Sequence, residues 1–269
     1  MKENRIGFIG TGNFCSAVIS GVIGSGYIMP ENISVFDIDS DKILQVSTTY
    51  RVLGAASAED VVKTCKYVFL TVKPQNFETV LLGILPFINP DTVIVNPAAG
   101  VSISYCKGLL GANCKVIRVM GNTPLLIGKG ATAIVNEAPV SDTEFSFVRG
   151  AFDACGVTVN VLEEQIDAVI GVSGSAPAFV FKFAQNVISV GVEAGLSQSD
   201  ATDLFCATLE GSAKMIASSG LSISELIKMV SSPGGTTVAG LEEMEKCDLD
   251  GAVSNGVKAS IERSKELTK

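Results

Sequence analysis

Hydrophobic and polar positions follow two different patterns along the chain. In the first part, short and almost wholly apolar runs alternate with segments whose apolar residues recur at helical spacing. Such runs are typical of strands that are buried on both faces of a parallel sheet. The alternation therefore predicts an α/β domain over residues 1–162. We predict strands at 5–9, 33–36, 67–72, 92–95, 115–119, 130–136 and 157–161, and helices at 15–24 and 141–152.

From residue 163 onward, the strand pattern stops and helical periods continue to the end of the chain. The segment 176–194 is apolar on nearly all sides, which predicts a buried helix. The expected fold class is therefore α/β, with an N-terminal Rossmann-type doubly wound sheet and an all-helical domain over residues 163–269. Further helices are predicted from Ser197, at 224–230, at 241–245 and at 250–267.

Composition narrows the possible functions. Of the 269 residues, 47% are hydrophobic and only 18% are charged, which suggests extensive contacts between subunits. The net charge of −8 and the lack of a long basic run argue against a nucleic-acid partner. The most apolar segment, 176–194, is interrupted by Lys182 and Glu193, so we expect no membrane partner. The seven cysteines form no C-x-x-C pair and the N-terminus leads directly into a strand, so we expect a cytoplasmic protein.

The chain contains no histidine. This removes the usual general base, the Ser-His-Asp triad and the commonest metal ligand, so we expect no metal site. Any chemistry must use a cofactor, hydroxyls, amides, lysines or carboxylates.

The turn after the first predicted strand carries two glycines, Gly10 and Gly12, directly before a helix. In a dinucleotide-binding unit, the first glycine allows a tight turn and the second lets backbone N–H groups approach a pyrophosphate. The third small position of that fingerprint is Cys15. The alternative is an ordinary strand–turn–helix.

Two later strand ends carry charged residues. Asp37 follows the second strand, where an acidic residue binds the adenosine ribose and repels a 2′-phosphate, which favours NAD over NADP. The alternative is a solvated turn that caps the helix starting near Asp41. Lys73 follows the 67–72 run and could neutralise phosphate charge; alternatively, it is a surface lysine before a helix that Pro74 starts.

Three further stretches suggest binding. The small residues Pro97, Ala98 and Ala99 would let a nicotinamide ring lie against the backbone, although a tight turn before a helix at Ser102 would look the same. Asn122 offers side-chain hydrogen bonds at the mouth of the sheet. The stretch 232–237, Ser-Pro-Gly-Gly-Thr-Thr, would form a nest of N–H groups and hydroxyls suited to a carboxylate; the alternative is a helix–helix turn.

Taken together, these motifs resemble the Δ1-pyrroline-5-carboxylate reductase family of proline synthesis. The matching stretches lie at 9–13, 72–75, 98–103, 118–124, 174–179 and 232–237. The resemblance implies a Rossmann domain and a helical domain that interlocks two subunits, often within a larger ring. It also implies hydride transfer from NAD(P)H to the C=N carbon of 1-pyrroline-5-carboxylate, giving proline.

The resemblance also implies roles for single residues. Thr237 would hydrogen-bond the ring nitrogen, Ser232 would assist, and Glu163 would be an acidic residue on the substrate side. The substrate carboxylate would be bound by Gly234, Gly235, Thr236 and Thr237. The cofactor would be contacted by Ile9, Gly10, Thr11, Gly12, Asn13, Phe14, Asp37, Thr71, Val72, Lys73, Pro74, Pro97, Ala98, Ala99 and Asn122.

The chain departs from the family pattern at a few positions. Gly121 stands where the family has proline, Ala176 where it has glycine, and Cys15 where it usually has alanine. A flexible glycine at 121 would loosen the loop that presents Asn122. Two alternatives follow: a diverged paralogue that reduces another cyclic imine or a β-hydroxyacid-type substrate, or a non-catalytic paralogue that only binds.

Overall fold

The computed structural model describes residues 4–268, and the chain divides into two compact units. The first unit comprises the chain up to Pro177 together with the residues from Ser260 on, and the second unit is Ala178–Ala259. This division differs from the predicted boundary after residue 162. One reason is that Ile166 is buried in a core of the first unit.

Within the described residues, eight strands form one sheet in the order β3-β2-β1-β4-β5-β6-β7-β8. The strands from β3 to β6 in this order are parallel, whereas β7 runs antiparallel to β6 and β8 is parallel to β7. All seven predicted strands are present, and the short β3 was not predicted. The strands are β1 (Ile6–Ile9), β2 (Ile33–Phe36), β3 (Leu53–Gly54), β4 (Tyr67–Leu70), β5 (Val93–Asn96), β6 (Lys115–Gly121), β7 (Gly130–Val135) and β8 (Gly156–Asn160).

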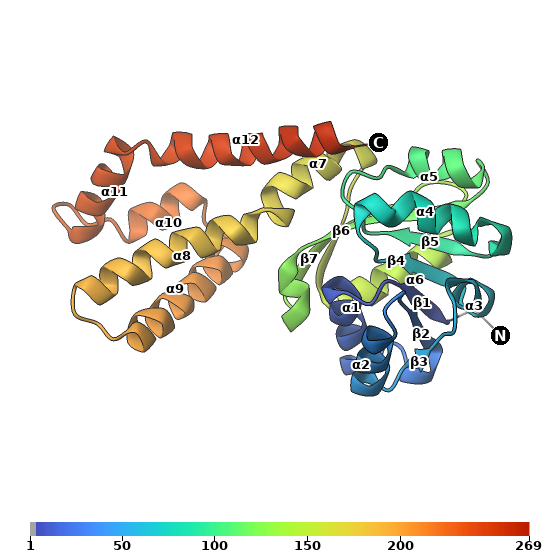
Figure 1. The fold of residues 1–269 in the computed structure, drawn as a ribbon. Coiled ribbons are helices and arrows are strands. Elements are labelled where there is room, and N and C mark those ends of the chain that lie inside the picture. Colours follow the sequence, from blue (N-terminus) through green and yellow to red (C-terminus); the bar gives the residue numbers. More distant parts are fainter. Residues whose placement is uncertain (1–3, 269) are drawn as a thin grey trace. The chain divides into compact units, whose positions relative to one another are not determined.

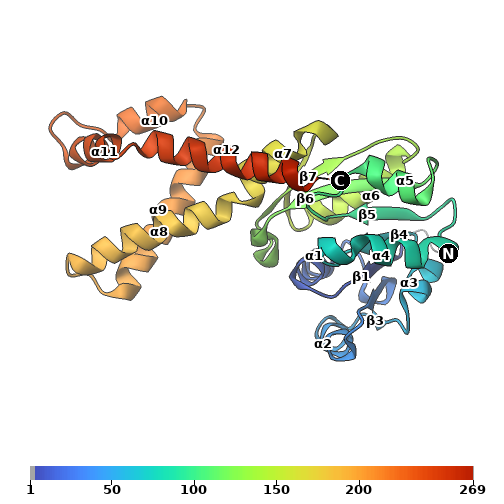
Figure 2. The ribbon, with the colours of Figure 1, turned by 45° about the horizontal axis from the view of Figure 1, so that its top comes forward.

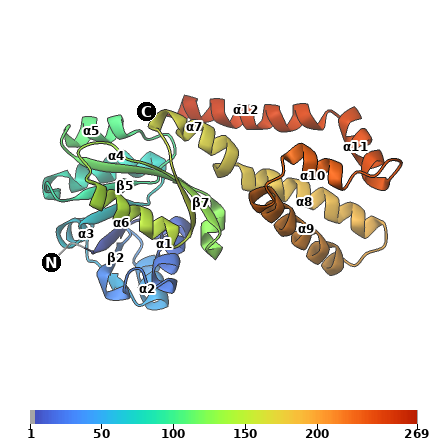
Figure 3. The ribbon, with the colours of Figure 1, turned by 180° about the vertical axis from the view of Figure 1, so that it is seen from behind.

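Helices cover both faces of this sheet (Figures 1 and 3). One core contains side chains of α1 (Asn13–Gly24), α2 (Ser40–Tyr50) and α6 (Asp142–Asp153). The core on the opposite face contains side chains of α3 (Ala58–Thr64), α4 (Pro74–Ile84), α5 (Ile103–Leu110) and α7 (Ile166–Val169). Shorter helical turns are η1 (Pro30–Asn32), η2 (Leu85–Phe87), η3 (Thr123–Ile127), η4 (Glu163–Gln165) and the π-helical η5 (Ile170–Gly174).

The strand order reverses between β1 and β4, which are neighbours in the sheet although two other strands separate them in sequence. Their carboxyl ends lie side by side, with Ile9 paired with Leu70. In open α/β sheets, ligands bind at such a switch point, outside the carboxyl ends of the strands. The fold therefore places the predicted cofactor residues after β1 and β4 at one edge.

The second unit is helical. It is formed by α8 (Ala176–Glu193), α9 (Gln198–Ser218), α10 (Ile223–Met229), α11 (Thr236–Lys246) and the greater part of α12 (Leu249–Leu267). Helices α8 and α9 run side by side (Figures 1 and 2), and the rings of Phe183 and Phe205 lie 5.9 Å apart.

The predicted burial of α8 is wrong for the single chain. No residue of α8 is buried, and Phe181 and Val190 are 65% and 62% exposed. The α8 helix is apolar on nearly all sides, as predicted, but these side chains are not covered by the chain itself. Exposed apolar faces of this kind mark interaction surfaces.

The helical segment 163–193 is long and apolar enough, by length and composition alone, to cross a membrane. Its most apolar window has a mean hydropathy of 1.3 and is 11% buried. The same two properties describe a helix that is covered by another protein chain.

Candidate functional site

The turn between β1 and α1 requires glycine at position 10. Gly10 has a φ of +101°, and a Cβ there would lie 2.7 Å from the Thr71 carbonyl carbon. The Gly10 amide donates to the Phe36 carbonyl at 2.8 Å, and the Thr71 hydroxyl donates to the Gly10 carbonyl at 2.5 Å. The turn is thus fixed against the ends of β2 and β4, as a tight phosphate-binding turn must be.

Gly12 differs from Gly10, because a Cβ at Gly12 would meet no protein atom within 4 Å. It is the N-cap of α1, where no side chain caps the helix and no acidic residue occupies the first turn. The N-terminal N–H groups of a helix attract anions when they have no other acceptor. The space over Gly12 and this helix end therefore fit the pyrophosphate of a dinucleotide.

Asp37 is held at the end of β2 by the β1–α1 turn. Its Oδ2 accepts the Thr11 amide at 2.8 Å and the Thr11 hydroxyl at 3.0 Å, and its Oδ1 accepts the Asp39 amide at 3.1 Å. Burial alone would raise the pKa of Asp37, but these hydrogen bonds and nearby Lys42 outweigh it and lower the pKa. The helix-capping alternative belongs instead to Asp39, which accepts the Asp41 amide.

A cavity of about 690 Å³ opens at the switch point. Its walls include the predicted cofactor residues Ile9, Gly10, Gly12, Asp37, Thr71, Val72 and Lys73. Thr11 and Asn13 line an adjoining cavity of about 280 Å³ between α1 and α2, and Lys42 lines both. Pro74 is the first residue of α4, as predicted.

The loop after β5 is organised by Asn96, whose side chain is fully buried. Its Nδ2 donates to the Val101 carbonyl and its Oδ1 accepts the Ala98 amide, both at 2.9 Å. On the other side, Gly100 packs on the end of α12, where a Cβ would lie 2.6 Å from the Leu267 carbonyl oxygen. The predicted nicotinamide residues Pro97, Ala98 and Ala99 therefore belong to a loop of fixed shape.

Asn122 and Phe14 have side-chain partners inside the protein rather than at the cavity. The Asn122 Oδ1 accepts the Ala131 amide at 2.9 Å, and its Nδ2 donates to the Ser173 hydroxyl at 3.2 Å. The Phe14 ring packs against Phe152. These contacts fix both side chains within the protein, and the predicted cofactor contacts of the two residues stay predictions.

The concern that Gly121 loosens a loop is wrong. Gly121 is the last residue of β6 and pairs with Thr132 of β7. A Cβ there would lie 2.5 Å from the Leu125 Cδ1 and 3.2 Å from the Phe14 ring. The Leu125 side chain therefore occupies the space that a side chain at position 121 would need.

Glu163 is engaged by an ion pair. Its Oε1 lies 2.8 Å from the Arg118 Nη1 and accepts the Ile103 amide at 2.7 Å. Arg118 is 2% exposed, and its Nε and Nη2 find no hydrogen-bond partner among residues 4–268. The prediction missed Arg118, although a charged residue inside the otherwise apolar run 116–120 was a usable signal.

The stretch 232–237 forms an open turn before α11 in the second unit. Gly234 has a φ of +70°, and the Gly235 amide donates to the Ser232 carbonyl at 2.9 Å. The first turn of α11 has no side-chain cap and no acidic residue. No hydrogen bond found among residues 4–268 uses the hydroxyls of Ser232, Thr236 or Thr237. N–H groups and hydroxyls of this kind suit a carboxylate.

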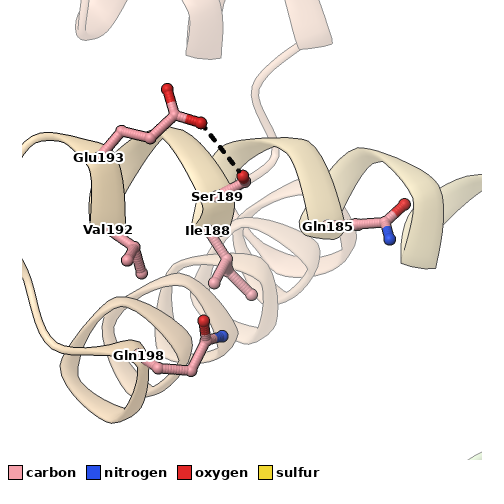
Figure 4. A pocket seen from close by; sticks show the side chains of 6 residues that line it. All are labelled: Gln185, Ile188, Ser189, Val192, Glu193 and Gln198. Carbon is pink, nitrogen blue, oxygen red and sulfur yellow. Dashed lines mark hydrogen bonds between the residues drawn. The ribbon is translucent and has the colours of Figure 1, made fainter.

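A hollow in the helical unit lies between α8 and α9, with a volume of about 420 Å³ (Figure 4). The Ser189 hydroxyl donates to Glu193 there at 3.5 Å. Its lining is Gln185, Ile188, Ser189, Val192, Glu193 and Gln198, and includes none of the predicted site residues. Among the described residues, no group of three or more His, Cys, Asp and Glu side chains could hold a metal ion.

Comparison with known proteins matches both parts of the chain. Residues 163–267 match the family model for pyrroline-5-carboxylate reductase dimerisation, and residues 5–100 match that for the F420-dependent NADP oxidoreductases. The exposed apolar helix α8 and the segment 163–193 thus lie within a dimerisation region.

Full-length relatives agree. The chain is 34% identical to pyrroline-5-carboxylate reductase of Escherichia coli over 99% of both chains, and 32% identical to that of Methanosarcina acetivorans over 100% of both. A crystal structure of the Plasmodium falciparum pyrroline carboxylate reductase with NADP bound superposes with a TM-score of 0.92, at 29% identity and 100% coverage of both chains. The chain therefore belongs to the pyrroline-5-carboxylate reductase family.

Proposed function

We propose that this protein reduces 1-pyrroline-5-carboxylate to proline with a reduced nicotinamide cofactor. The observation that carries the proposal is the open turn at 232–237, where backbone N–H groups and hydroxyls meet at an uncapped helix start. This turn lies in a chain that matches reductases of this name along its full length.

The first unit would hold the cofactor. Gly12 and the N-terminus of α1 would bind the pyrophosphate, and the loop Pro97–Ala99 would face the nicotinamide. When bound, the reduced nicotinamide supplies a hydride to the carbon of the ring C=N bond, while the ring nitrogen takes a proton from solvent. The protein's contribution is to bind and orient, which suits a chain without histidine.

The second unit would bind the substrate. The N–H groups of Gly234 and Thr236 would donate to the carboxylate, with the Ser232 hydroxyl as a further donor. The Gly235 N–H donates to the Ser232 carbonyl and would hold the turn in shape. The Thr237 hydroxyl would hydrogen-bond the ring nitrogen and thereby fix the orientation of the C=N bond. These roles rest on the uncapped start of α11 and on the motif.

We also propose a preference for NADH. The carboxylate of Asp37 remains ionised, because its pKa is lowered, and it lines the cavity beside Asp39. Two negative charges there would repel a 2′-phosphate. Lys42 opposes this effect, and it is itself paired with Asp39 at 3.7 Å.

The family's dimerisation region implies an oligomer, and we propose a homodimer or a larger ring of dimers that covers the apolar surface of α8. We propose a cytoplasmic location, in which cysteines such as the buried Cys15, Cys106 and Cys155 stay reduced. Burial raises the pKa of the Cys106 thiol to about 12 and that of Cys155 to about 11.

The decisive experiment measures initial rates of NADH and NADPH oxidation with 1-pyrroline-5-carboxylate. Turnover typical of a biosynthetic enzyme supports the proposal, and the ratio of the two rates tests Asp37. Folded protein that binds nucleotide but reduces only a different cyclic imine, or none, would overturn it. The packing of Leu125 accounts for one of the departures, Gly121, that raised those alternatives.

A further inference from the structure

We propose that the ion pair between the buried Arg118 and the partly exposed Glu163 is a positioning device for the loop between β5 and α5. This loop, Pro97–Ser102, is the one that we place at the nicotinamide, so the catalytic consequence rests on the proposed function. The structural part, that the pair fixes the loop, does not depend on that function.

Arg118 lies in the interior of the first unit. Arg118 is the central residue of β6 and lies next to Asn96 of β5 in the sheet register. It is nearly completely buried, and within the described residues Glu163 is the acceptor that it has. The Glu163 side chain is 20% exposed, so it is the buried guanidinium that depends on the pair: without this carboxylate it would be an unpaired buried charge.

The Glu163 carboxylate also holds the start of α5. The same Oε1 atom accepts the amide of Ile103, the first residue of α5. Glu163 begins η4, at the start of the region matched to family dimerisation. One oxygen atom therefore joins β6, the beginning of the dimerisation region and the end of the loop.

The loop is also held by Asn96, the last residue of β5. The Asn96 side chain donates to the Val101 carbonyl and accepts the Ala98 amide. Asn96 thus shapes the loop from within, whereas Glu163 anchors its exit into α5. Loss of the anchor would leave the Asn96 hydrogen bonds to hold the loop alone, and small displacements of a group that orients a reactant reduce turnover sharply.

The test compares wild-type protein with E163Q, R118K and R118M/E163Q. The glutamine keeps an oxygen for Ile103 but loses the charge that Arg118 fixes. The double variant removes both charges, so it leaves no unpaired buried ion if E163Q alone does not fold. R118K keeps one cationic donor at position 118, and the observed pair uses one donor atom.

Two measurements are made on each variant: hydrogen exchange of the amides at 101–105, and kcat and KM with the imine. We expect E163Q and R118M/E163Q to exchange at least about tenfold faster at Ile103 and to lose at least about tenfold in kcat. The KM for the imine should stay within about threefold, because neither residue belongs to the stretch 232–237 that we propose for the carboxylate. R118K should show much smaller changes than these two variants, both in exchange at Ile103 and in kcat.

The matched control is E144Q. Glu144 is as buried as Arg118, is ion-paired with Lys115 at 2.8 Å, and accepts backbone and hydroxyl hydrogen bonds at the start of α6. It lies outside the proposed site. E144Q should lower the melting temperature without changing kcat by more than about threefold or exchange at Ile103.

Wild-type exchange at Ile103 in R118M/E163Q would overturn the proposal, as would an equal loss of kcat in E144Q. If the wild-type protein does not reduce the imine, the proposed function fails, and the exchange data still decide whether the pair fixes the loop.

Discussion

Thr11 donates both its backbone amide and its hydroxyl to one carboxylate oxygen of Asp37. The residue expected to select the cofactor is therefore also a structural support of the glycine turn. Its charge is maintained by hydrogen bonds that the protein itself provides.

Replacing Asp37 should change both cofactor preference and stability. In D37N, we expect the ratio of kcat/KM for NADH to that for NADPH to fall about tenfold, because the charge opposing a 2′-phosphate is removed. The melting temperature should also fall, since two N–H donors and a hydroxyl lose a charged acceptor. Rates with both nucleotides and a thermal melt measure this.

D41N is the control for this change. Asp41 lies in the first turn of α2, and its side chain is exposed. The NADH/NADPH ratio of D41N should stay within about twofold of wild type. An unchanged ratio in D37N would refute a selective role for Asp37.

The two glycines of the turn should respond oppositely to alanine. G10A should be destabilised by several kcal/mol or fail to fold, because the residue needs a positive φ and its Cβ would overlap the Thr71 backbone. G12A should keep its melting temperature within a few degrees but bind nucleotide at least about tenfold more weakly, because its methyl group enters the ligand space. Calorimetry and nucleotide titration separate the two; equal loss of binding without unfolding in both would be inconsistent.

Removing the Thr237 hydroxyl should reduce turnover. T237V keeps the shape of the side chain but loses the proposed hydrogen bond to the ring nitrogen, so we expect kcat/KM to fall about 10- to 100-fold. T208V is the control, because the Thr208 hydroxyl donates to the Leu204 carbonyl within α9. Steady-state rates of both variants check this, and normal activity in T237V would remove that residue from the mechanism.

The acid stability of the protein should depend on Glu144. Burial alone would raise its pKa, but hydrogen bonds from Lys115, Ser141 and Lys66 outweigh burial and lower the pKa to about 2. A lowered pKa stabilises the fold above the unfolded value of about 4.3, and this contribution is lost as pH falls toward about 2. It amounts to about 3 kcal/mol at most. The free energy of unfolding of E144Q should therefore decline less steeply over this range than that of wild type; parallel curves would contradict the assignment.

Filling the space above Gly121 should be costly and partly reversible. G121A should destabilise the fold by about 1–3 kcal/mol, because its Cβ would overlap Leu125. L125A alone should cost about 2–5 kcal/mol through a cavity. In G121A/L125A the cost should be less than the sum, and denaturant unfolding of the three variants measures this. Strict additivity would show that Leu125 does not occupy the glycine's space.

Much of the fold could be predicted because the local patterns and the final packing agree. The apolar runs became the strands of the sheet, and capping residues such as Ser141 start helices where expected. The antiparallel β7 was not predicted, because a buried apolar run carries no information about strand direction. The exposure of α8 could not be predicted either, because its pattern is satisfied only by contacts beyond the single chain.

A cavity at the carboxyl ends of the strands could be predicted from the sequence, whereas the roles of its residues stay predictions. The positions after β1, β2 and β4 line one cavity, because strand ends meet at the switch point. The partners of Asn122 and Glu163 were not predicted, since both bind residues far away in sequence, Ser173 and Arg118. Long-range side-chain pairs of this kind leave no periodic trace in a sequence.

The contact of Gly100 with Leu267 bears on how the protein is made. The first unit contains the chain up to Pro177 and also the residues from Ser260 on. During synthesis, the N-terminal sheet can form early. The loop at Gly100 gains its contact with Leu267 only when the end of α12 has left the ribosome, so the first unit is completed only after the helical unit has been translated.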